Sequence, residues 1–488
     1  MKMNFIKQSI PICFIVLAAI GCKVGESYVR PNVLNIDNYY GNNTQLDTAS
    51  VDRSNLADVN WRDYFEDSIL ISLIDSALVK NFDLKREIQR IEIGNQAFQQ
   101  SRANFYPNLG ISPFGFNREY FSENFNNFGS NRARRNHGEN PPKTLYTERL
   151  AYTTSIFASW EIDLWGKLRW QKEAAQASFM QSQEFQKAVQ TAIVAEVAST
   201  YYNMLMINSQ IAVAERNLEL GRSTLEIVKL QFQADETTSL AIQQTESQIL
   251  RAESLIPQLE RSYIILENRL NQLLGRYPQP INIQQDLEDV AFDERYVTGV
   301  PLELISNRPD IAAAEYQLIA NNAQVGVNRA MRYPSLVLDA STGLNSFIFE
   351  SFLNPMGSGF ALFNGAIFQP IFQNKRLKAN YNIAVAERQL AELDFKDNVV
   401  LAVREVSDAL VTIEKLREEY NIALRRIIVT TKGVQDASLL FQSGFANYLE
   451  VINAQEDALQ SELDLADLKR QIIIANIELY RSLGGGWK

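Results

Sequence analysis

Residues 232–246 read FQADETTSLAIQQTE, and residues 441–455, which lie 209 positions later, read FQSGFANYLEVINAQ. Each stretch follows a long proline-free segment with helical patterning, and each begins a new helical pattern within a few residues. Gly444 adopts a left-handed backbone conformation at low cost, and Asp235 stands at the matching place in the first stretch. The two stretches therefore predict two helix hairpins, with their turns at Asp235 and Gly444.

An apolar ladder precedes each turn, and its steps alternate between three and four residues. In the first half of the chain its members are Met204, Ile207, Ile211, Ala214, Leu218, Gly221, Leu225, Val228 and Phe232. Shifted by 209 positions, it comprises Ile413, Leu416, Tyr420, Ala423, Ile427, Thr430, Val434, Ala437 and Phe441. Such spacing is the seam of a left-handed coiled coil, and residues 167–231 alone would extend roughly 98 Å as a helix. We expect a second such helix over 376–441, with Phe232 and Phe441 closing the two seams.

A further repeat pairs RANFYPNL at residues 102–109 with RAMRYPSL at residues 329–336. Together with the ladders, it indicates two copies of one supersecondary unit. The boundaries we expect are a signal peptide at 1–21, an extended N-terminal segment at 22–65, a first repeat (helix, β-hairpin, long helix pair) at 66–275, a linker or equatorial segment at 276–307, a second repeat at 308–483 and a C-terminal tail at 484–488.

Segments with a two-residue period interrupt the helical pattern. Within 152–164, apolar side chains alternate with threonine, serine, glutamate and aspartate, which predicts a strand with one apolar and one polar face. Residues 336–345 alternate likewise, and less regular strands are expected over 106–116 and 360–368. Aromatic residues gather at the strand ends, as they do at membrane interfaces: Tyr106, Trp160, Trp165, Tyr333, Phe368 and Phe372. A soluble sandwich with an aromatic core is the alternative that this period leaves open.

Composition excludes several function classes. The chain of 488 residues has a formal net charge of −10, one histidine and two cysteines. An acidic balance does not suit a nucleic-acid partner, and His137, Cys13 and Cys22 are too few for histidine catalysis, a zinc site or a disulfide framework. Glu161 and Asp163 share a strand face but fit a solvated wall better than an acid–base pair. We therefore expect no enzymatic activity and no cofactor.

The N-terminus has the form of a secretory signal, with Lys2 and Lys7 before the apolar run 10–20. Residues 17–21, LAAIG, precede Cys22 in the manner of a bacterial lipoprotein cleavage box, which would leave Cys22 as the acylated first residue. Ordinary signal cleavage with an incidental cysteine is the alternative. Beyond this segment no stretch has the roughly 20 apolar residues of a transmembrane helix, so any membrane crossing would use strands.

Four strands cannot close a barrel, and lipid does not tolerate an open sheet edge. Two copies would supply eight strands, which pack solid, whereas three copies would supply twelve, which leave a lumen. The fold class that we expect is mainly α with membrane β: a trimeric 12-stranded β-barrel, with four strands per chain, continued by a long helical barrel of coiled helix pairs, and two internal repeats in each chain.

An ordered set of motifs spans the mature chain: Tyr106-Pro107, Ile162–Lys167, Asn307–Ile311, Tyr333-Pro334, Gln369–Phe372, Gly444 with Tyr448-Leu449, and Leu483–Trp487. By these motifs the chain resembles the TolC family of outer-membrane efflux proteins, in the OprM/NodT-type lipoprotein branch. The resemblance implies a homotrimeric, passive exit duct from periplasm to exterior, lipid-anchored in the outer membrane of a Gram-negative bacterium and carrying small molecules such as drugs or toxic compounds. It also implies three partners: outer-membrane lipid, a periplasmic adaptor (membrane fusion) protein and an inner-membrane efflux transporter.

The resemblance also assigns roles to residues. Together with the aromatic placement, it assigns to the barrel interface Tyr106, Pro107, Trp160, Trp165, Tyr333, Pro334 and Phe372. It assigns Leu449, Glu450 and Asn453 to a constriction at the periplasmic end, where a ring of Glu450 carboxylates would favour cations. Relatives commonly have aspartate in place of Asn453, and the TolC protein has arginine in place of Ala446, so a salt-bridge lock is not expected here. A solvated Glu450 outside the aperture is the alternative.

Two other functions remain open from the sequence. One is the outer-membrane duct of a protein secretion system, and the other is a coiled-coil envelope lipoprotein without a pore. The alternating strand at 152–164 speaks against the second, and the lipoprotein signal with the terminal Gly-Gly-Gly-Trp favours efflux over secretion.

Overall fold

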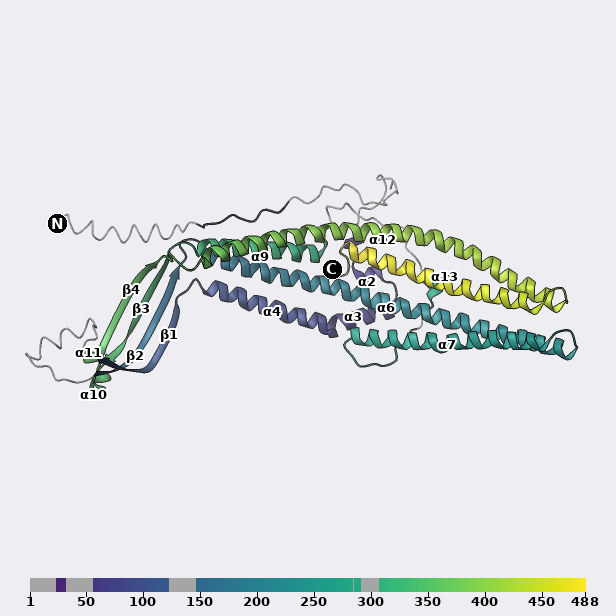
Figure 1. The fold of residues 1–488 in the computed structure, drawn as a ribbon, viewed down its shortest axis with the longest axis horizontal. Coiled ribbons are helices and arrows are strands. Elements are labelled where there is room, and N and C mark those ends of the chain that lie inside the picture. The colour runs from purple at the N-terminus through teal and green to yellow at the C-terminus, as the bar shows by residue number, and fades with distance from the viewer. Residues whose placement is uncertain (1–22, 32–55, 123–145, 284, 291–306) are drawn as a thin grey trace, which may run out of the picture. The chain divides into compact units, whose positions relative to one another are not determined.

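The computed structural model of the chain describes residues 23–31, 56–122, 146–283, 285–290 and 307–488 (Figure 1). They form two compact units, and each unit draws on both halves of the sequence. The first unit takes the described residues of Met1–Val29, Gly94–Ala177 and Ile319–Leu390, and the second takes those of Arg30–Ile93, Ser178–Leu318 and Ala391–Lys488. The predicted signal peptide, Cys22 and His137 lie outside the described residues.

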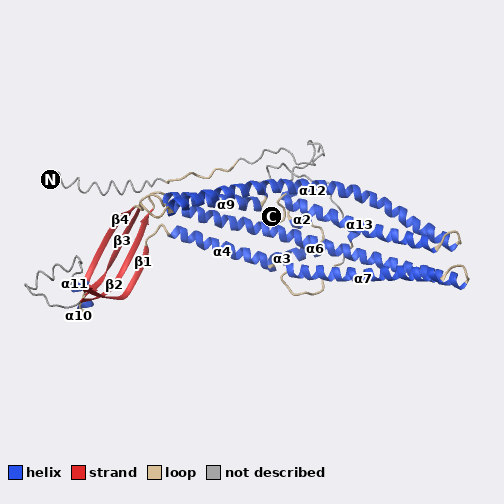
Figure 2. Ribbon diagram, in the orientation of Figure 1, coloured by secondary structure: helices blue, strands red, loops and turns tan. Residues whose placement is uncertain are grey.

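The first unit contains one antiparallel sheet with the strand order β1-β2-β3-β4 (Figure 2). Its strands are Asn108–Ser122 (β1), Tyr146–Ile162 (β2), Ser335–Ser346 (β3) and Gly359–Phe368 (β4). Two short helices, Phe349–Phe352 (α10) and Pro355–Ser358 (α11), lie between β3 and β4 in the sequence. All four predicted strands are thus confirmed, in two hairpins.

Strand β2 differs from its prediction at both ends. It begins six residues earlier, at Tyr146, and it ends at Ile162 rather than at Leu164. The early end has a local cause, since the Asp163 carboxylate accepts hydrogen bonds from the backbone N–H groups of Leu168 and Arg169 at 3.0 and 3.2 Å. Asp163 therefore stabilises the start of the next helix and is not part of a strand face.

Long helices make up most of the remaining chain. Phe82–Ala103 (α4) and Pro309–Ala330 (α9) have 22 residues each, Lys167–Gln233 (α6) and Arg376–Gln442 (α12) have 67 each, and Ser239–Leu273 (α7) and Tyr448–Ser482 (α13) have 35 each. The two longest helices end within two residues of their predicted limits, because no proline or left-handed residue interrupts them. Within the described ranges, no helix has both the length and the apolar composition that a bilayer-spanning helix requires.

Within 22–65, expected as extended, two short helices occur, Leu56–Asp58 (η1) and Trp61–Tyr64 (α2). The side chain of Asn60 caps α2 by accepting a hydrogen bond from the N–H of Arg62 at 2.9 Å. A further helix, Ser68–Lys80 (α3), follows, and another 3₁₀ turn spans Leu287–Asp289 (η2). The capping side chain of Asn60 thus starts a helix that the apolar periodicity did not indicate.

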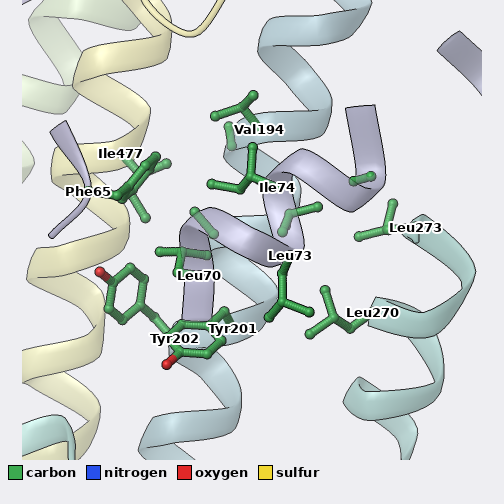
Figure 3. Packing of buried hydrophobic residues seen from close by; sticks show 14 of the residues in the cluster. Phe65, Leu70, Leu73, Ile74, Val194, Tyr201, Tyr202, Leu270, Leu273 and Ile477 are labelled. Atoms are coloured by element: carbon green, nitrogen blue, oxygen red, sulfur yellow. The ribbon is translucent and has the colours of Figure 1, made fainter. Parts of the chain in front are cut away.

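The core of the second unit is built around α3. Ile74 of α3 is buried beside Val194 of α6, and Leu73 of α3 is buried beside Leu270 of α7 (Figure 3). The Asp67 carboxylate caps α3 by accepting from the N–H of Ile69 at 2.7 Å, and it also accepts from the Tyr201 hydroxyl of α6. Burial, followed by the bond to Asp67, raises the pKa of Tyr201 above its ordinary value. One carboxylate therefore both starts α3 and fixes it to α6.

Candidate functional site

The two faces of the sheet carry different side chains. Residues directly opposite each other in neighbouring strands point to the same face, and the register pairs Ile111 with Ile156 and Ile156 with Thr342. The face that contains Ile156 is mostly apolar: Leu109, Ile111, Ala158, Trp160, Ile162, Leu336, Leu338, Ala340, Phe363 and Ile367. The opposite face is mostly polar: Ser112, Ser155, Ser159, Glu161, Asp339, Ser341, Asn345 and Asn364.

The apolar face is uncovered in the single chain. Leu109 and Phe363, on the first and last strands, are 76% and 74% exposed, and Ile111 and Ile367 are exposed as well. Among the described residues, β1 pairs only with β2 and β4 only with β3, so both edges of the sheet are open. An exposed apolar surface of this extent marks a contact with lipid or with protein, and open edges offer unpaired backbone groups to further strands.

Tryptophan side chains stabilise the ends of the strands nearest the helices. The indole N–H of Trp160 donates to the carbonyl of Phe105 at 2.9 Å, and that of Trp165 donates to the carbonyl of Pro334 at 2.7 Å. The Trp165 ring stacks on Tyr333 with 5.0 Å between the ring centroids. Each indole thus has its polar atom satisfied, while Trp160 is 40% exposed, an arrangement suited to a boundary between water and apolar surroundings.

The remaining residues assigned to this boundary are on the surface. Tyr106 is 73% exposed, and Pro107 and Phe372 are exposed too. Tyr106 and Pro107 lie in the link between α4 and β1, and Phe372 lies in the link between β4 and α12. The seven residues named from the sequence therefore occupy the same end of the sheet, where each strand meets a helix.

The tip of the second hairpin, between α12 and α13, is closed by several interactions. Gly444 has a φ of +75°, which is the left-handed conformation that glycine adopts without strain. The Asn447 side chain accepts from the N–H of Glu450 at 3.2 Å, and the Glu450 carboxylate accepts from the N–H of Asn447 at 3.3 Å, which forms a capping box. Phe441 is buried in a cluster with Val451 and with residues of the first hairpin.

The tip of the first hairpin, between α6 and α7, is less closed. Asp235 has a φ of +61°, and Thr238 stands at the N-cap of α7 without a side-chain hydrogen bond to the helix. Phe232 is 42% exposed, so the prediction that it closes the seam is wrong. The helical period predicts the face of α6 on which Phe232 lies. Val228, one turn earlier on that face, is buried, whereas Phe232 at the tip is not.

The two hairpin tips are joined within the chain. The Tyr448 hydroxyl of α13 donates to the side-chain oxygen of Gln244 of α7 at 2.5 Å. Farther from the tips, the buried Gln455 side chain donates to the Thr224 hydroxyl at 2.8 Å. Sequence analysis did not single out these polar bridges, since each joins residues more than 200 positions apart.

The three residues assigned to a constriction lie close together on α13. Leu449, Glu450 and Asn453 are all exposed in the single chain, and their spacing of one and four positions places them on neighbouring parts of the helix surface. Glu450 is occupied in the capping box but keeps its charge accessible to solvent. Both interpretations of Glu450, as a pore residue and as a solvated residue outside the aperture, are consistent with this placement.

Arg308, within the Asn307–Ile311 motif, joins three parts of the second unit. Its guanidinium donates to the Glu405 carboxylate of α12 at 2.7 Å, to the carbonyl of Ser482 at 3.1 Å and to Asp310 at 2.6 Å. Burial raises the pKa of Asp310, but the bonds and charge of Arg308 outweigh burial, and the pKa lies below its ordinary value. Arg308 therefore fixes the first turn of α9 to the end of α13.

No group of three or more histidine, cysteine, aspartate or glutamate side chains in the described part of the chain is placed to hold a metal ion. The informative features are instead an open sheet with one exposed apolar face, aromatic residues along one end of it, and two paired hairpins of long helices. Together these define a class of proteins, the outer-membrane channels that combine strands with long helix hairpins.

Comparison with known proteins gives the family. The sequence pattern of the family described as "Outer membrane efflux protein" matches residues 73–276 and 300–485. The chain belongs to this family and is an outer-membrane channel protein of efflux.

Three relatives illustrate the similarity. The cation efflux system protein CusC of Escherichia coli (strain K12) is 28% identical over 477 residues, which cover 98% of this chain and 99% of CusC. The probable outer membrane lipoprotein SilC of Salmonella typhimurium is 28% identical over 433 residues, 88% of each chain. The open-state crystal structure of the Neisseria gonorrhoeae MtrE outer membrane channel superimposes with a TM-score of 0.81 at 26% identity, covering 96% of this chain and 99% of MtrE.

Proposed function

We propose that three copies of this chain form the outer-membrane exit duct of a tripartite efflux pump. Twelve strands, four from each copy, close one barrel in the outer membrane, and the helix pairs of the three copies form a helical barrel that continues the passage through the periplasm. The duct itself is passive, and small molecules such as drugs or toxic compounds pass through it.

The observation that carries this proposal is the open sheet. The described part of each chain contains one four-stranded sheet, in which both edges are unpaired and one face is apolar, with Leu109 and Phe363 largely exposed. In lipid, every backbone N–H and C=O needs a partner within the protein. Strand β1 of one copy pairing with β4 of the next would satisfy both edges at once, and it would turn the face with Ser155, Asp339 and Asn364 toward a water-filled lumen.

The helices support a repeated plan within each chain. The helix lengths match in pairs, 22, 67 and 35 residues, and the starts of α6 and α12 are 209 positions apart, as are the starts of α7 and α13. We infer that residues 66–275 and 308–483 are two copies of one unit. Three chains would then place six similar hairpins around one axis.

Membership of the family supports the proposed protein partners. CusC is named as part of a cation efflux system, and we propose that this chain likewise works with a periplasmic adaptor protein and an inner-membrane transporter. The lipoprotein name of SilC, together with the LAAIG sequence before Cys22, supports acylation of Cys22. The aromatic residues at the end of the sheet would then lie at the inner boundary of the membrane.

The constriction is proposed at the second hairpin tip. Leu449 and Asn453 narrow the closed end, and three Glu450 carboxylates favour cations over anions. The test is the ion selectivity of the purified protein in planar bilayers, with Glu450→Gln compared with Glu456→Gln, an exposed acid of the same helix. We expect cation preference to fall for Glu450→Gln alone, and an unchanged preference would remove Glu450 from the pore.

The experiment for the duct itself is conductance. Purified protein added to a planar bilayer is expected to give discrete steps of uniform size, as channels of fixed stoichiometry do. The variants Ile156→Arg and Phe363→Arg, which place a positive charge near the middle of the apolar face, are expected to reduce insertion strongly, because an arginine on the lipid face costs about 2–4 kcal/mol at the bilayer midplane. Insertion that is indifferent to both substitutions would contradict the proposed membrane face.

A further inference from the structure

A pocket of about 680 Å³ in the first unit is lined mainly by cations. Its charged and aromatic lining includes Lys23, Arg102, Tyr106, Arg169, Lys172 and Glu173. These residues come from three separate stretches: the N-terminal segment, the end of α4 and the first turns of α6. Four bases face one acid, so the pocket carries a positive charge that the protein itself does not balance.

Two of the four bases have acidic partners. Lys23 pairs with Glu173 at 2.5 Å, and Arg169 pairs with Asp163 at 3.0 Å. The other two, Arg102 and Lys172, form no ion pair with any residue that the structure describes. Two positive charges in a concave site of this size provide a match for a phosphate group, which the planar guanidinium and the ammonium both bind well.

The N-terminal segment is held in place against α6. The N–H of Val24 donates to the carbonyl of Trp165 at 3.1 Å, and the indole N–H of Trp170 donates to the carbonyl of Val24 at 2.8 Å. The Lys23 ammonium lies 3.4 Å from the centre of the buried Trp170 ring. Gly25, with a φ of +144°, lies so close to Trp170 that an added Cβ would be 2.6 Å from the ring. Lys23 is therefore held at the pocket by the contacts of its own segment with Trp165 and Trp170.

The surroundings of the pocket suit an amphiphile. Tyr106, one of its lining residues, is largely exposed and stands two positions before β1, whose Leu109 belongs to the apolar face. Lys23 directly follows Cys22, the residue at which we propose a lipid anchor. A phospholipid presents the same sequence of groups, a charged headgroup joined to apolar chains.

We propose that this pocket binds the phosphate of an anionic glycerophospholipid of the membrane leaflet that faces the periplasm. Arg102 and Lys172 bind the phosphate, Lys23 and Arg169 add to the positive potential, and Tyr106 lies beside the glycerol region. The inference rests on the proposed insertion of the sheet into the outer membrane. One lipid bound per chain would fix the depth at which the strands end.

Native mass spectrometry of the delipidated, full-length protein tests this site. The protein is titrated with phosphatidylglycerol, with phosphatidylcholine and with inorganic phosphate. We expect one saturable phosphatidylglycerol per chain, and about 30-fold weaker binding to the double variant Arg102→Gln, Lys172→Gln, since two basic groups near anionic lipid together contribute about 2 kcal/mol. The matched control is Lys378→Gln, Arg388→Gln, which removes the same charges from α12 outside the pocket, and it should bind as the unmodified protein does.

Further variants and readouts separate the possible outcomes. The charge-conserving variant Arg102→Lys, Lys172→Arg should retain binding, which shows that a loss in the glutamine variant is not a folding defect. Equal loss of lipid binding in the pocket variant and the control variant would show that binding depends on general surface charge, and this would overturn the proposal. Displacement of the lipid by inorganic phosphate would also overturn it, because it would indicate a site for free phosphate. Conductance is measured on the same preparations. If channels form but the protein does not distinguish phosphatidylglycerol from phosphatidylcholine, only this site is refuted. If no channels form, the proposed function is refuted.

Discussion

The two hairpin tips follow the same backbone path but are stabilised to different degrees. The second tip has a left-handed glycine, Gly444, a capping box and a phenylalanine, Phe441, that is only 5% exposed. The first tip has Asp235 in the left-handed conformation, no side-chain cap, and Phe232 substantially exposed. Equal helix lengths fix where both tips lie, whereas local side chains decide how firmly each one is closed.

This difference coincides with the proposed division of roles. Leu449, Glu450 and Asn453 all lie within two turns of the capped start of α13. A constriction needs side chains held in fixed positions, and the second tip provides them through its cap and buried cluster. The first tip lacks the cap and the buried phenylalanine, and it is joined to the second through Tyr448 and Gln244. Four predictions test the comparison.

The largest effect is expected from the two phenylalanines. Phe441→Ala should lower the free energy of local opening at the tips by about 3 kcal/mol, because it leaves a cavity among Val228, Ala241 and Val451. Phe232→Ala should cost less than about 1 kcal/mol, because much of its side chain already contacts water. Hydrogen exchange of tip amides measures both values, and equal losses would contradict the difference between the tips.

The N-caps of α13 and α7 are expected to differ in their contribution to stability, by less than the two phenylalanines do. Asn447→Ala should destabilise the first turn of α13 by about 1 kcal/mol, because it removes the side-chain oxygen that accepts from the N–H groups of Leu449 and Glu450. Thr238→Ala should change the first turn of α7 by only about 0.3 kcal/mol, since its side chain makes no cap bond. Amide exchange in the first turn of each helix is the readout; a Thr238 effect as large as that of Asn447 would show that both tips are capped in solution.

The turn residues should respond in opposite directions. An added Cβ at Gly444 meets no atom within 4 Å, so Gly444→Ala should destabilise by about 1 kcal/mol through backbone strain alone. Asp235→Gly should stabilise the first tip by about 0.5 kcal/mol, because glycine adopts the same φ without strain. Thermal denaturation of the two variants gives the signs, and the same sign for both would refute the account of the turns.

The smallest effect is expected at the bridge between the tips. Tyr448→Phe removes the hydroxyl that donates to Gln244 and should cost about 0.5 kcal/mol, since the bond is accessible to water. A double-mutant cycle with Gln244→Ala isolates the coupling between the two side chains. Independent, additive effects on tip exchange would mean that the two hairpins are not joined at this point.

Most of the fold was predictable from the periodicity of apolar residues in the sequence. The steps of three and four residues predicted α6 and α12 to within two residues of their ends, and the alternation at 152–164 predicted most of β2. The ordered set of motifs from Tyr106-Pro107 to Leu483–Trp487 indicated the family, which the comparison confirms. These signals are local, so a single sequence displays them.

Contacts between distant parts of the chain were not predictable in this way. Arg308 was identified only as part of the Asn307–Ile311 motif, yet its partners Glu405 and Ser482 lie 97 and 174 positions away. Neither the exposure of Phe232 nor the position of Lys23 over Trp170 follows from period or composition. Each depends on which segments pack side by side, and only the structure gives that.

The central claim is that a four-stranded sheet with two open edges becomes complete only with further copies of the same chain. Analytical ultracentrifugation of the detergent-solubilised protein, with the bound detergent matched in density, measures the number of chains in each particle directly. The account predicts three chains and no smaller species at concentrations where channels form. A stable single chain or a dimer that still conducts would contradict it.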